Sequence, residues 1–157
     1  MTEKTKIKLD HVISKFSDEY KALFQEITEH IISLGYTAKV NVKETYADFV
    51  KSKHGKTIMK IECGYDNPQI PRLSIRFDAL PVCSGHFQEA IEHFIEGCPS
   101  CRKCNGRFGN KYVLSDGREV FPCRATIYMP FFNTDTLSEV KEALSIQDDF
   151  LIKHHSK

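Results

Sequence analysis

Three cysteines stand close together near the middle of the chain: Cys98, Cys101 and Cys104. A Cys-x-x-Cys turn lets two thiolates reach one metal ion, and zinc binds four such ligands in a tetrahedron, at about 2.3 Å from each sulfur. Cys123 is the natural fourth ligand, because it lies on a later segment that is expected to return toward the cluster. The spacing therefore predicts a structural zinc site made by these four cysteines, within a metal-binding segment spanning residues 98–123.

Other chemistries compete with zinc for these thiols. The cysteine run resembles the first part of a bacterial ferredoxin motif, which would imply an iron–sulfur cluster. It lacks that motif's fourth close cysteine followed by proline, since Asn105 and Gly106 come next. Free thiols without any metal are a further alternative. If only three cysteines bind zinc, the open position would take water, His93 or a substrate, and the zinc would then be catalytic.

The cellular compartment is inferred from segments that the sequence lacks. The first residues, 1–6, have no apolar run of the kind that a secretory signal needs. No stretch approaches the roughly 18 apolar residues of a membrane span. These observations predict a cytoplasmic protein with no membrane partner. In that compartment its six cysteines indicate metal binding, thiol chemistry or burial rather than a disulfide framework.

Two features outside the cluster are candidates for catalysis. Cys83 stands at the expected start of a helix, where the helix dipole would lower its pKa, although a buried structural thiol is favoured. His86, Glu89 and His93 fall on one side of that helix and would bring an acid–base pair or a ligand near the cluster, although solvated histidines are commoner. No GxSxG, P-loop, HExxH or GxGxxG arrangement occurs in a fitting context.

The leading hypothesis is therefore a non-enzymatic, metal-stabilised binding module. Its ligand would be another protein or a small molecule held between sheet and helix. The alternative is a thiol-dependent or open-site zinc enzyme that uses Cys83 or a free member of the cluster.

Basic residues surround the predicted zinc site and raise nucleic acid as a minority hypothesis. Six cations stand against two acids: Arg102, Lys103, Arg107, Lys111, Arg118 and Arg124 against Asp116 and Glu119. Phe108 or Tyr112 would then stack on a base. However, a zinc ion with four thiolates carries about two negative charges, which neighbouring cations stabilise. The whole chain carries a formal charge of only +1, so the global charge does not favour nucleic acid.

Residues 1–157 are expected to form a single α+β domain, in which a mainly antiparallel sheet packs with three helices and carries the cysteine-rich loop and a hairpin. Hydrophobic residues at helical spacing predict helices at 17–34, at 84–97 and from 136 onward. Alternating residues predict strands at 36–43, 58–64 and 73–78, a hairpin at 112–121 and its extension at 125–129. Short connections favour an antiparallel meander with one covered face.

The remaining expectations concern the ends of the domain and the role of the metal. Residues 1–16 are expected to be a flexible arm or a short helix, and residues 153–157 a flexible tail. Asp148 and Asp149 are expected to form an exposed charged pair. Because the domain has a core of its own, zinc is expected to order residues 98–123 rather than to make the whole domain fold.

Overall fold

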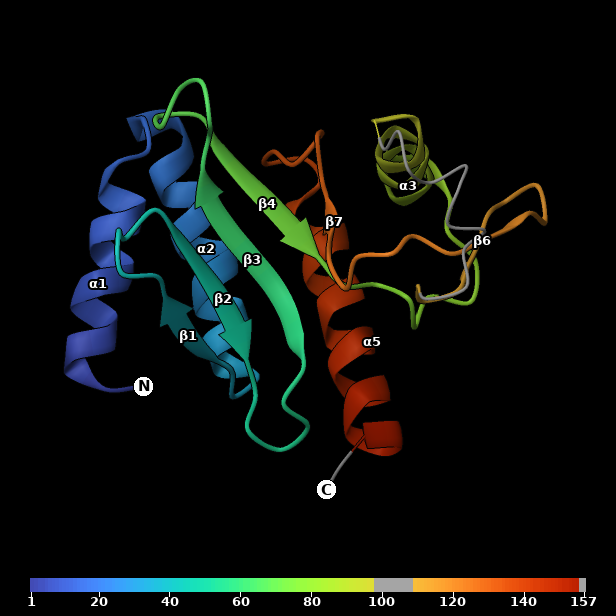
Figure 1. Cartoon of the computed structure of the whole chain (residues 1–157), viewed down its shortest axis with the longest axis horizontal. Coiled ribbons are helices and arrows are strands. Elements are labelled where there is room, and N and C mark those ends of the chain that lie inside the picture. Colours follow the sequence, from blue (N-terminus) through green and yellow to red (C-terminus); the bar gives the residue numbers. More distant parts are fainter. Residues whose placement is uncertain (98–108, 156–157) are drawn as a thin grey trace.

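The computed structural model describes residues 1–97 and 109–155, and it confirms the α+β class (Figure 1). Within these ranges there are four helices, one more than expected: α1 (Glu3–Ser14), α2 (Asp18–Ser33), α3 (Gly85–Gly97) and α5 (Leu137–His155). The main sheet has five strands: β1 (Thr37–Val40), β2 (Tyr46–Val50), β3 (Thr57–Cys63), β4 (Pro71–Ile75) and β7 (Ile127–Tyr128). A separate hairpin pairs β5 (Tyr112–Val113) with β6 (Glu119–Val120).

The strands of the main sheet lie in the order β1-β2-β3-β4-β7, and all neighbouring pairs are antiparallel. The expected meander is therefore confirmed. The expected strand at 36–43 is too long, because the chain turns at Asn41. The Asn41 side-chain oxygen accepts hydrogen bonds from the backbone N–H groups of Thr45 and Tyr46, at 2.8 and 3.0 Å. This turn starts β2, a strand that the sequence pattern did not reveal.

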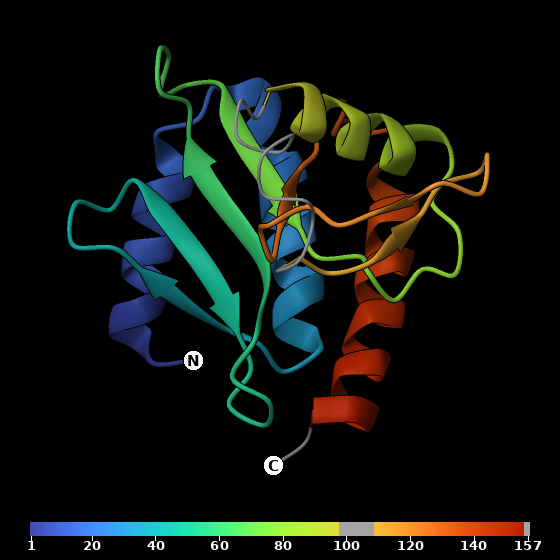
Figure 2. The same cartoon turned by 45° about the vertical axis from the view of Figure 1, so that its right-hand side comes forward.

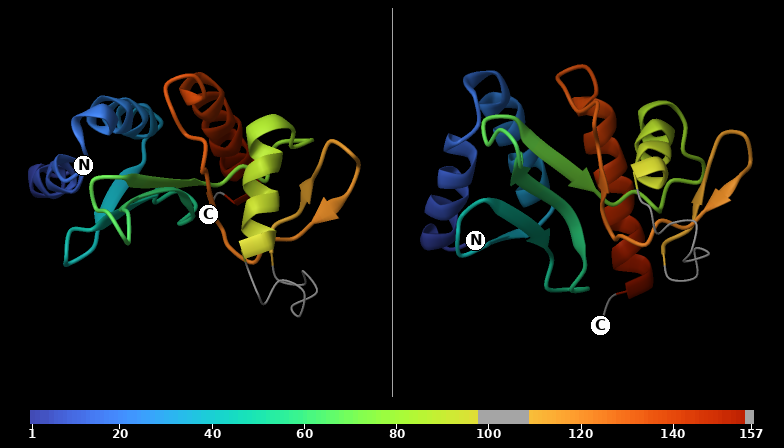
Figure 3. Two further views of the ribbon diagram at one scale, coloured as in Figure 1. Left: turned by 90° about the horizontal axis from the view of Figure 1, so that it is seen from above. Right: turned by 45° about the horizontal axis from the view of Figure 1, so that its top comes forward.

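The two faces of the sheet differ in polarity because side chains alternate along each strand. The apolar face carries buried side chains on four strands: Ala47, Phe49, Met59, Ile61, Leu73, Ile75 and Ile127. Helices α2 and α5 lie on this face, and α1 packs beside α2 against β1 and β2 (Figure 3). The opposite face carries polar side chains from β2, β3, β4 and β7: Tyr46, Asp48, Lys60, Glu62, Arg72, Ser74 and Tyr128.

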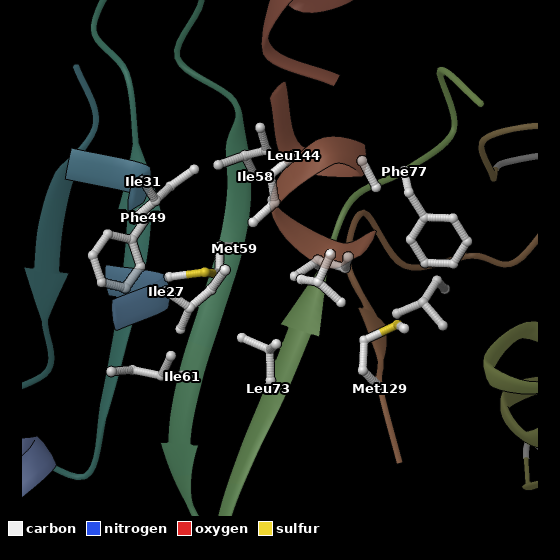
Figure 4. Close-up of a cluster of buried hydrophobic side chains, with 14 of the residues drawn as sticks. Ile27, Ile31, Phe49, Ile58, Met59, Ile61, Leu73, Phe77, Met129 and Leu144 are labelled. Carbon is white, nitrogen blue, oxygen red and sulfur yellow. The ribbon is translucent and has the colours of Figure 1, made fainter. Parts of the chain in front are cut away.

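The core lies between the apolar face and the helices. Figure 4 shows Ile27 and Ile31 of α2 beside Phe49 and Met59 of the sheet. The α2 helix ends as its sequence predicts. Gly35, at φ 89°, donates its N–H to the Ile32 carbonyl, so the Schellman-type stop needs glycine's freedom at positive φ.

The first 16 residues are largely helical rather than a flexible arm. Leu9, Val12, Ile13 and Phe16 follow one another at helical spacing and are all buried. Thr2 caps α1, since its side-chain oxygen accepts a hydrogen bond from the Thr5 N–H at 3.3 Å. The many charged residues of this segment occupy the solvent side of α1, which hides its narrow apolar stripe in the sequence.

The C-terminal region corrects two further expectations. Helix α5 continues through His155, so residues 153–155 belong to a helix and not to a flexible tail. Asp148 is buried and is not part of an exposed pair. It accepts hydrogen bonds from the Tyr36 hydroxyl at 2.9 Å and from Lys51 Nζ at 2.9 Å, while Asp149 is exposed. No helix within the described ranges is long and apolar enough to cross a membrane.

Candidate functional site

The predicted zinc ligands divide between the described and the undescribed parts of the chain. Cys98, Cys101 and Cys104 lie outside the described residues, whereas Cys123 is a free, exposed cysteine in the segment between β6 and β7. Within residues 1–97 and 109–155, no group of three or more histidine, cysteine or acidic side chains is placed to hold a metal ion. The four-cysteine zinc site therefore stays a prediction.

Gly97 and Gly109 are the described residues that flank segment 98–108, and each has a spatial relation to the segment that carries Cys123. On the N-terminal side, Gly97 at the end of α3 lines the same pocket as Cys123. On the C-terminal side, the Gly109 backbone packs directly against the backbone of residues 121–122. A Cβ atom at residue 109 would collide with the Pro122 carbonyl oxygen and lie 2.5 Å from that of Phe121. The close approach explains why a glycine stands at position 109.

The chain after Gly109 is held in place by a buried charge cluster. Arg76 donates hydrogen bonds to both carboxylate oxygens of Asp78, at 2.7 and 3.2 Å, and to the Asn110 side-chain oxygen at 3.2 Å. The Arg76 side chain is 8% exposed and that of Asp78 is 10% exposed. This cluster joins the end of β4 to the first described residues after the cysteine run. Helix α3 and the β5–β6 hairpin lie together on this side of the molecule (Figure 2).

A pocket of about 560 Å³ opens between the polar face of the sheet and α3. Pockets for small molecules commonly measure about 300–1,000 Å³. Strands β3, β4 and β7 contribute one wall and α3 contributes another. The lining residues are Lys60, Glu62, Tyr65, Arg72, Ser74, His93, Phe94, Gly97, Cys123, Arg124, Thr126 and Tyr128.

Charge and aromatic rings are concentrated in this pocket. Three cations, Lys60, Arg72 and Arg124, face one carboxylate, Glu62. Lys60 Nζ lies 2.6 Å from a Glu62 oxygen, while Arg72 Nε lies 3.9 Å from the other oxygen. The Arg72 guanidinium carbon lies 4.4 Å from the ring centroid of Tyr128. The pocket therefore combines excess positive charge with flat apolar surface.

The polar face beside the pocket also perturbs an acid. Asp48, the cross-strand neighbour of Lys60, has its pKa raised from the ordinary value, mainly by burial. The Glu62 charge raises this pKa further, while Lys60 and Lys39 oppose the shift. A partly buried carboxyl beside a lysine keeps the polar face from being uniformly cationic.

The histidines of α3 separate into two environments. His93 lines the pocket, and its ring centroid lies 6.2 Å from that of Tyr128. His86 lies one and a half to two turns earlier, where its Nδ1 is 3.5 Å from a Glu89 oxygen and its ring is 6.0 Å from that of Phe131. Of the three residues singled out on this helix, only His93 shares the pocket with Cys123.

Cys83 has the environment of a structural thiol. It is fully buried, and its N–H donates to the Val113 carbonyl at 2.6 Å. Burial raises the pKa of Cys83 to about 11, and the Asp78 charge adds to the shift. This burial agrees with the favoured expectation of a structural thiol and disfavours the alternative of a thiol activated by the helix dipole, because loss of solvation disfavours the thiolate. Cys63, at the end of β3, is half-buried, and burial raises its pKa as well.

The basic residues near the predicted site are largely paired where they are described. Arg118 contacts Glu92 at 2.8 Å and Asp116 at 2.5 Å, and Lys111 contacts Glu119 at 2.9 Å. Tyr112 is buried, so it does not offer a ring for a base to stack on. Arg102, Lys103, Arg107 and Phe108 lie outside the described residues.

The sequence did not single out Lys60, Arg72 or Tyr128 as site residues. A signal for them does exist, because the alternation in β3 and β4 places charged residues on the face opposite the apolar one. That alternation alone does not distinguish a solvated face from one wall of a pocket, which depends on where α3 packs.

No family model, curated protein or solved structure matches this chain.

Proposed function

We propose that this chain is a zinc-stabilised binding module that holds a small molecule between its sheet and α3. The single observation that carries the proposal is the position of the two described residues that flank the cysteine run, relative to the segment that carries Cys123. Cys98 is covalently bonded to Gly97, which lines the pocket with Cys123, and Gly109 packs on Pro122. Four thiolates from residues 98–123 would need this kind of approach to share one ion.

Zinc in this module would order one segment and would not be needed for folding of the rest. Of the described residues 109–123, Tyr112 and Leu114 belong to the buried core and Val120 packs against it, while the bulk of the core comes from α1, α2, α5 and the main sheet. Zinc contributes on the order of 10 kcal/mol to the folding of isolated zinc-finger peptides, which lack such a core. Here the same ion would fix the rim of the pocket. We place the module in the cytoplasm, where the thiols stay reduced.

Metal analysis of the purified full chain tests the zinc site. We expect one zinc per chain and a colourless protein, whereas absorption in the visible range would indicate an iron–sulfur cluster instead. Cys123→Ser should lower the zinc content. Cys63→Ser is the matched control and should keep the zinc, because Cys63 lies outside the predicted ligand set and alternates with Glu62, so it faces away from the pocket wall. Equal zinc content in both variants would overturn the assignment of Cys123.

Chelation tests the role of the metal. Removal of zinc should leave the thermal transition of the core unchanged. It should change only the amide NMR signals of α3, the hairpin and the residues near Cys123. Loss of the whole cooperative transition on chelation would contradict the proposal. Amide signals in a two-dimensional NMR spectrum distinguish these outcomes, since each residue of the core and of the zinc-binding segment gives its own signal.

An open zinc site is the second candidate function, and His93 is the observation that favours it. His93 lines the pocket with Cys123, so a site with three cysteines would leave a position for imidazole, water or a substrate. Cobalt substitution distinguishes the two functions through the absorption spectrum. A spectrum that changes in His93→Ala supports the open site, and an unchanged spectrum supports four thiolates.

A further inference from the structure

Arg72 is held in an unusual way at the centre of the pocket wall. It lies in β4 on the polar face, and its side chain is 32% exposed. The guanidinium carbon lies 5.1 Å from the ring centroid of Tyr65 and 4.4 Å from that of Tyr128. Cation–π contacts with two rings restrict the orientation of the guanidinium. These contacts use its flat face, so the N–H donors at its edge can bond to other partners.

The Arg72 guanidinium makes no hydrogen bond within residues 1–97 and 109–155, and its ion pair there, with Glu62, is long. The nearest acid, Glu62, is 3.9 Å from Arg72 Nε and already accepts a hydrogen bond from Lys60 Nζ at 2.6 Å. A guanidinium held in place with an open fork of donors matches the two oxygens of a carboxylate or a phosphate. The position of Arg72 therefore favours a ligand that offers two anionic oxygens.

Two further groups in the pocket add to the same preference. Arg124 is exposed at the rim and makes no hydrogen bond or ion pair within the described part of the chain. Ser74 lines the wall between Lys60 of β3 and Tyr128 of β7, its partners across the sheet. An anion in the pocket would meet two arginines and a hydroxyl. A cation would meet three positive charges and only Glu62 in return.

We propose that this pocket binds a small molecule that carries a carboxylate or phosphate group, with Arg72 as its main anchor and Arg124 as a second cation. The rest of the ligand packs on the rings of Tyr128 and Phe94. This inference rests on the proposed function only in assuming that the pocket is a binding site for a small molecule. It does not need the zinc.

A small ligand is favoured over nucleic acid by the distribution of charge. Lys111 and Arg118, the other described cations of the region, are paired with acids, so they do not extend the pocket into a basic track. Among the described residues, Arg72 and Arg124 both line one concave site rather than a surface that would follow a phosphate backbone.

The test uses three probes with the same ring: phenyl phosphate, benzoate and the neutral benzamide. Each is titrated into the full, zinc-loaded chain, and binding is followed by amide chemical shifts. We expect both anions to shift signals of β4, β7 and α3, and benzamide to bind at least several-fold more weakly. The tighter of the two anions identifies the group that the pocket prefers.

Variants assign the anchor. Arg72→Gln should weaken anion binding about tenfold or more, as expected for loss of a charge-assisted hydrogen-bonded pair. Arg72→Lys keeps the charge but loses the planar fork, so it should recover only part of the affinity. Arg118→Gln removes the same charge outside the pocket and should leave the affinity within about twofold, since screening weakens distant surface charges. The thermal transition of each variant shows that it is folded.

Several results would overturn the inference. They are equal binding of benzamide and benzoate, no shift with either anion, and equal weakening by Arg72→Gln and Arg118→Gln. Binding of mixed oligonucleotides that phenyl phosphate does not displace would assign the face to nucleic acid and would likewise overturn it.

Removal of the metal separates this inference from the zinc proposal. The titration is repeated after zinc is removed with phenanthroline, a neutral chelator that does not compete for an anion site. Anion binding by a chain that never held zinc would sink the zinc proposal and leave this inference standing. If zinc-loaded protein binds neither anion, this inference fails and the zinc proposal stands.

Discussion

Two arginines four residues apart, Arg72 and Arg76, have opposite surroundings. Arg72 lies within β4, whereas Arg76 directly follows this strand, where its N–H bonds to the Ile58 carbonyl of β3 at 2.8 Å. Arg76 is covered, and its guanidinium is satisfied by Asp78 and Asn110. Arg72 lies in the pocket between two tyrosines, and its guanidinium makes no hydrogen bond among the described residues.

The comparison teaches that the charge of Arg76 stabilises the fold, whereas the charge of Arg72 is accessible to a ligand. Burying a charge is costly unless a partner and hydrogen bonds compensate for the lost water, and Asp78 supplies both to Arg76. Arg72 keeps contact with solvent and needs no such partner for the chain to fold. Its unfilled donors are therefore compatible with stability and useful for binding.

The largest effect is expected when the buried pair is broken. Arg76→Gln should lower the free energy of unfolding by about 3–5 kcal/mol, because the Asp78 carboxylate is left buried without its counter-charge. Urea unfolding measures this. Arg72→Gln is the comparison, and it should lower the free energy of unfolding by no more than about 1 kcal/mol, as for a partly exposed ion pair. Similar losses in the two variants would remove the distinction between the arginines.

A smaller and more local effect is expected at Gly109. Gly109→Ala places a Cβ against the Pro122 carbonyl oxygen, so the backbone of residues 109 and 122 must separate. The variant should bind zinc less tightly, measured by competition with a chromophoric chelator, and should keep the thermal transition of the core. Gly97→Ala is the matched control, because a Cβ there meets no atom of the described residues within 4 Å. Tighter or unchanged zinc binding in Gly109→Ala would contradict the predicted approach to Cys123.

The smallest effect concerns the pH dependence of Cys83. Its thiol has an ordinary pKa of 9.0 and a folded-state pKa of about 11, so the folded state keeps its proton over a range in which the unfolded state loses it. The unfolded state then binds fewer protons, and this thiol's contribution to stability, complete below pH 9, declines as pH rises toward 11.

Comparison with Cys83→Ala isolates this contribution. The difference in the free energy of unfolding between the parent chain and the variant should shrink as pH rises from 9 to 11. Alkylation followed by mass spectrometry gives a second measurement. At pH 8 the buried Cys83 should react far more slowly in the native state than in urea. Fast native labelling of Cys83 would restore the thiol-dependent enzyme as a hypothesis.

Several elements of the fold could be predicted from local sequence signals. The α2 helix has a strong apolar period and a glycine stop at Gly35, and the β5–β6 hairpin has Gly117 at φ 83° in its turn. Local sequence signals gave a wrong prediction where a tertiary contact determines the environment of a residue. Asp148 reads as an exposed acid until Tyr36 and Lys51, distant in the sequence, are placed against it.

The candidate site likewise has one part that the sequence predicts, the cysteine cluster, and one part that it does not, the pocket. The cysteine spacing predicts a metal site on local grounds, and that prediction still awaits a measurement of bound metal. The pocket was outside the reach of the sequence, because its walls come from β3, β4, β7, α3 and the segment at Cys123. Periodicity places Lys60 and Arg72 on the polar face, but only the packing of α3 beside β7 turns that face into a cavity.

The sequence by itself determined the class of the fold, the antiparallel meander and the clustering of thiols, because these depend on periods and spacings within short stretches. The tertiary structure decided which charges are satisfied and which are open. Arg72 and Arg76 have the same side chain and lie four residues apart, yet Arg76 is covered and bonds to Asp78 and Asn110, whereas Arg72 faces the pocket. The strength of a charge depends on its solvation and its partners, and the fold sets both.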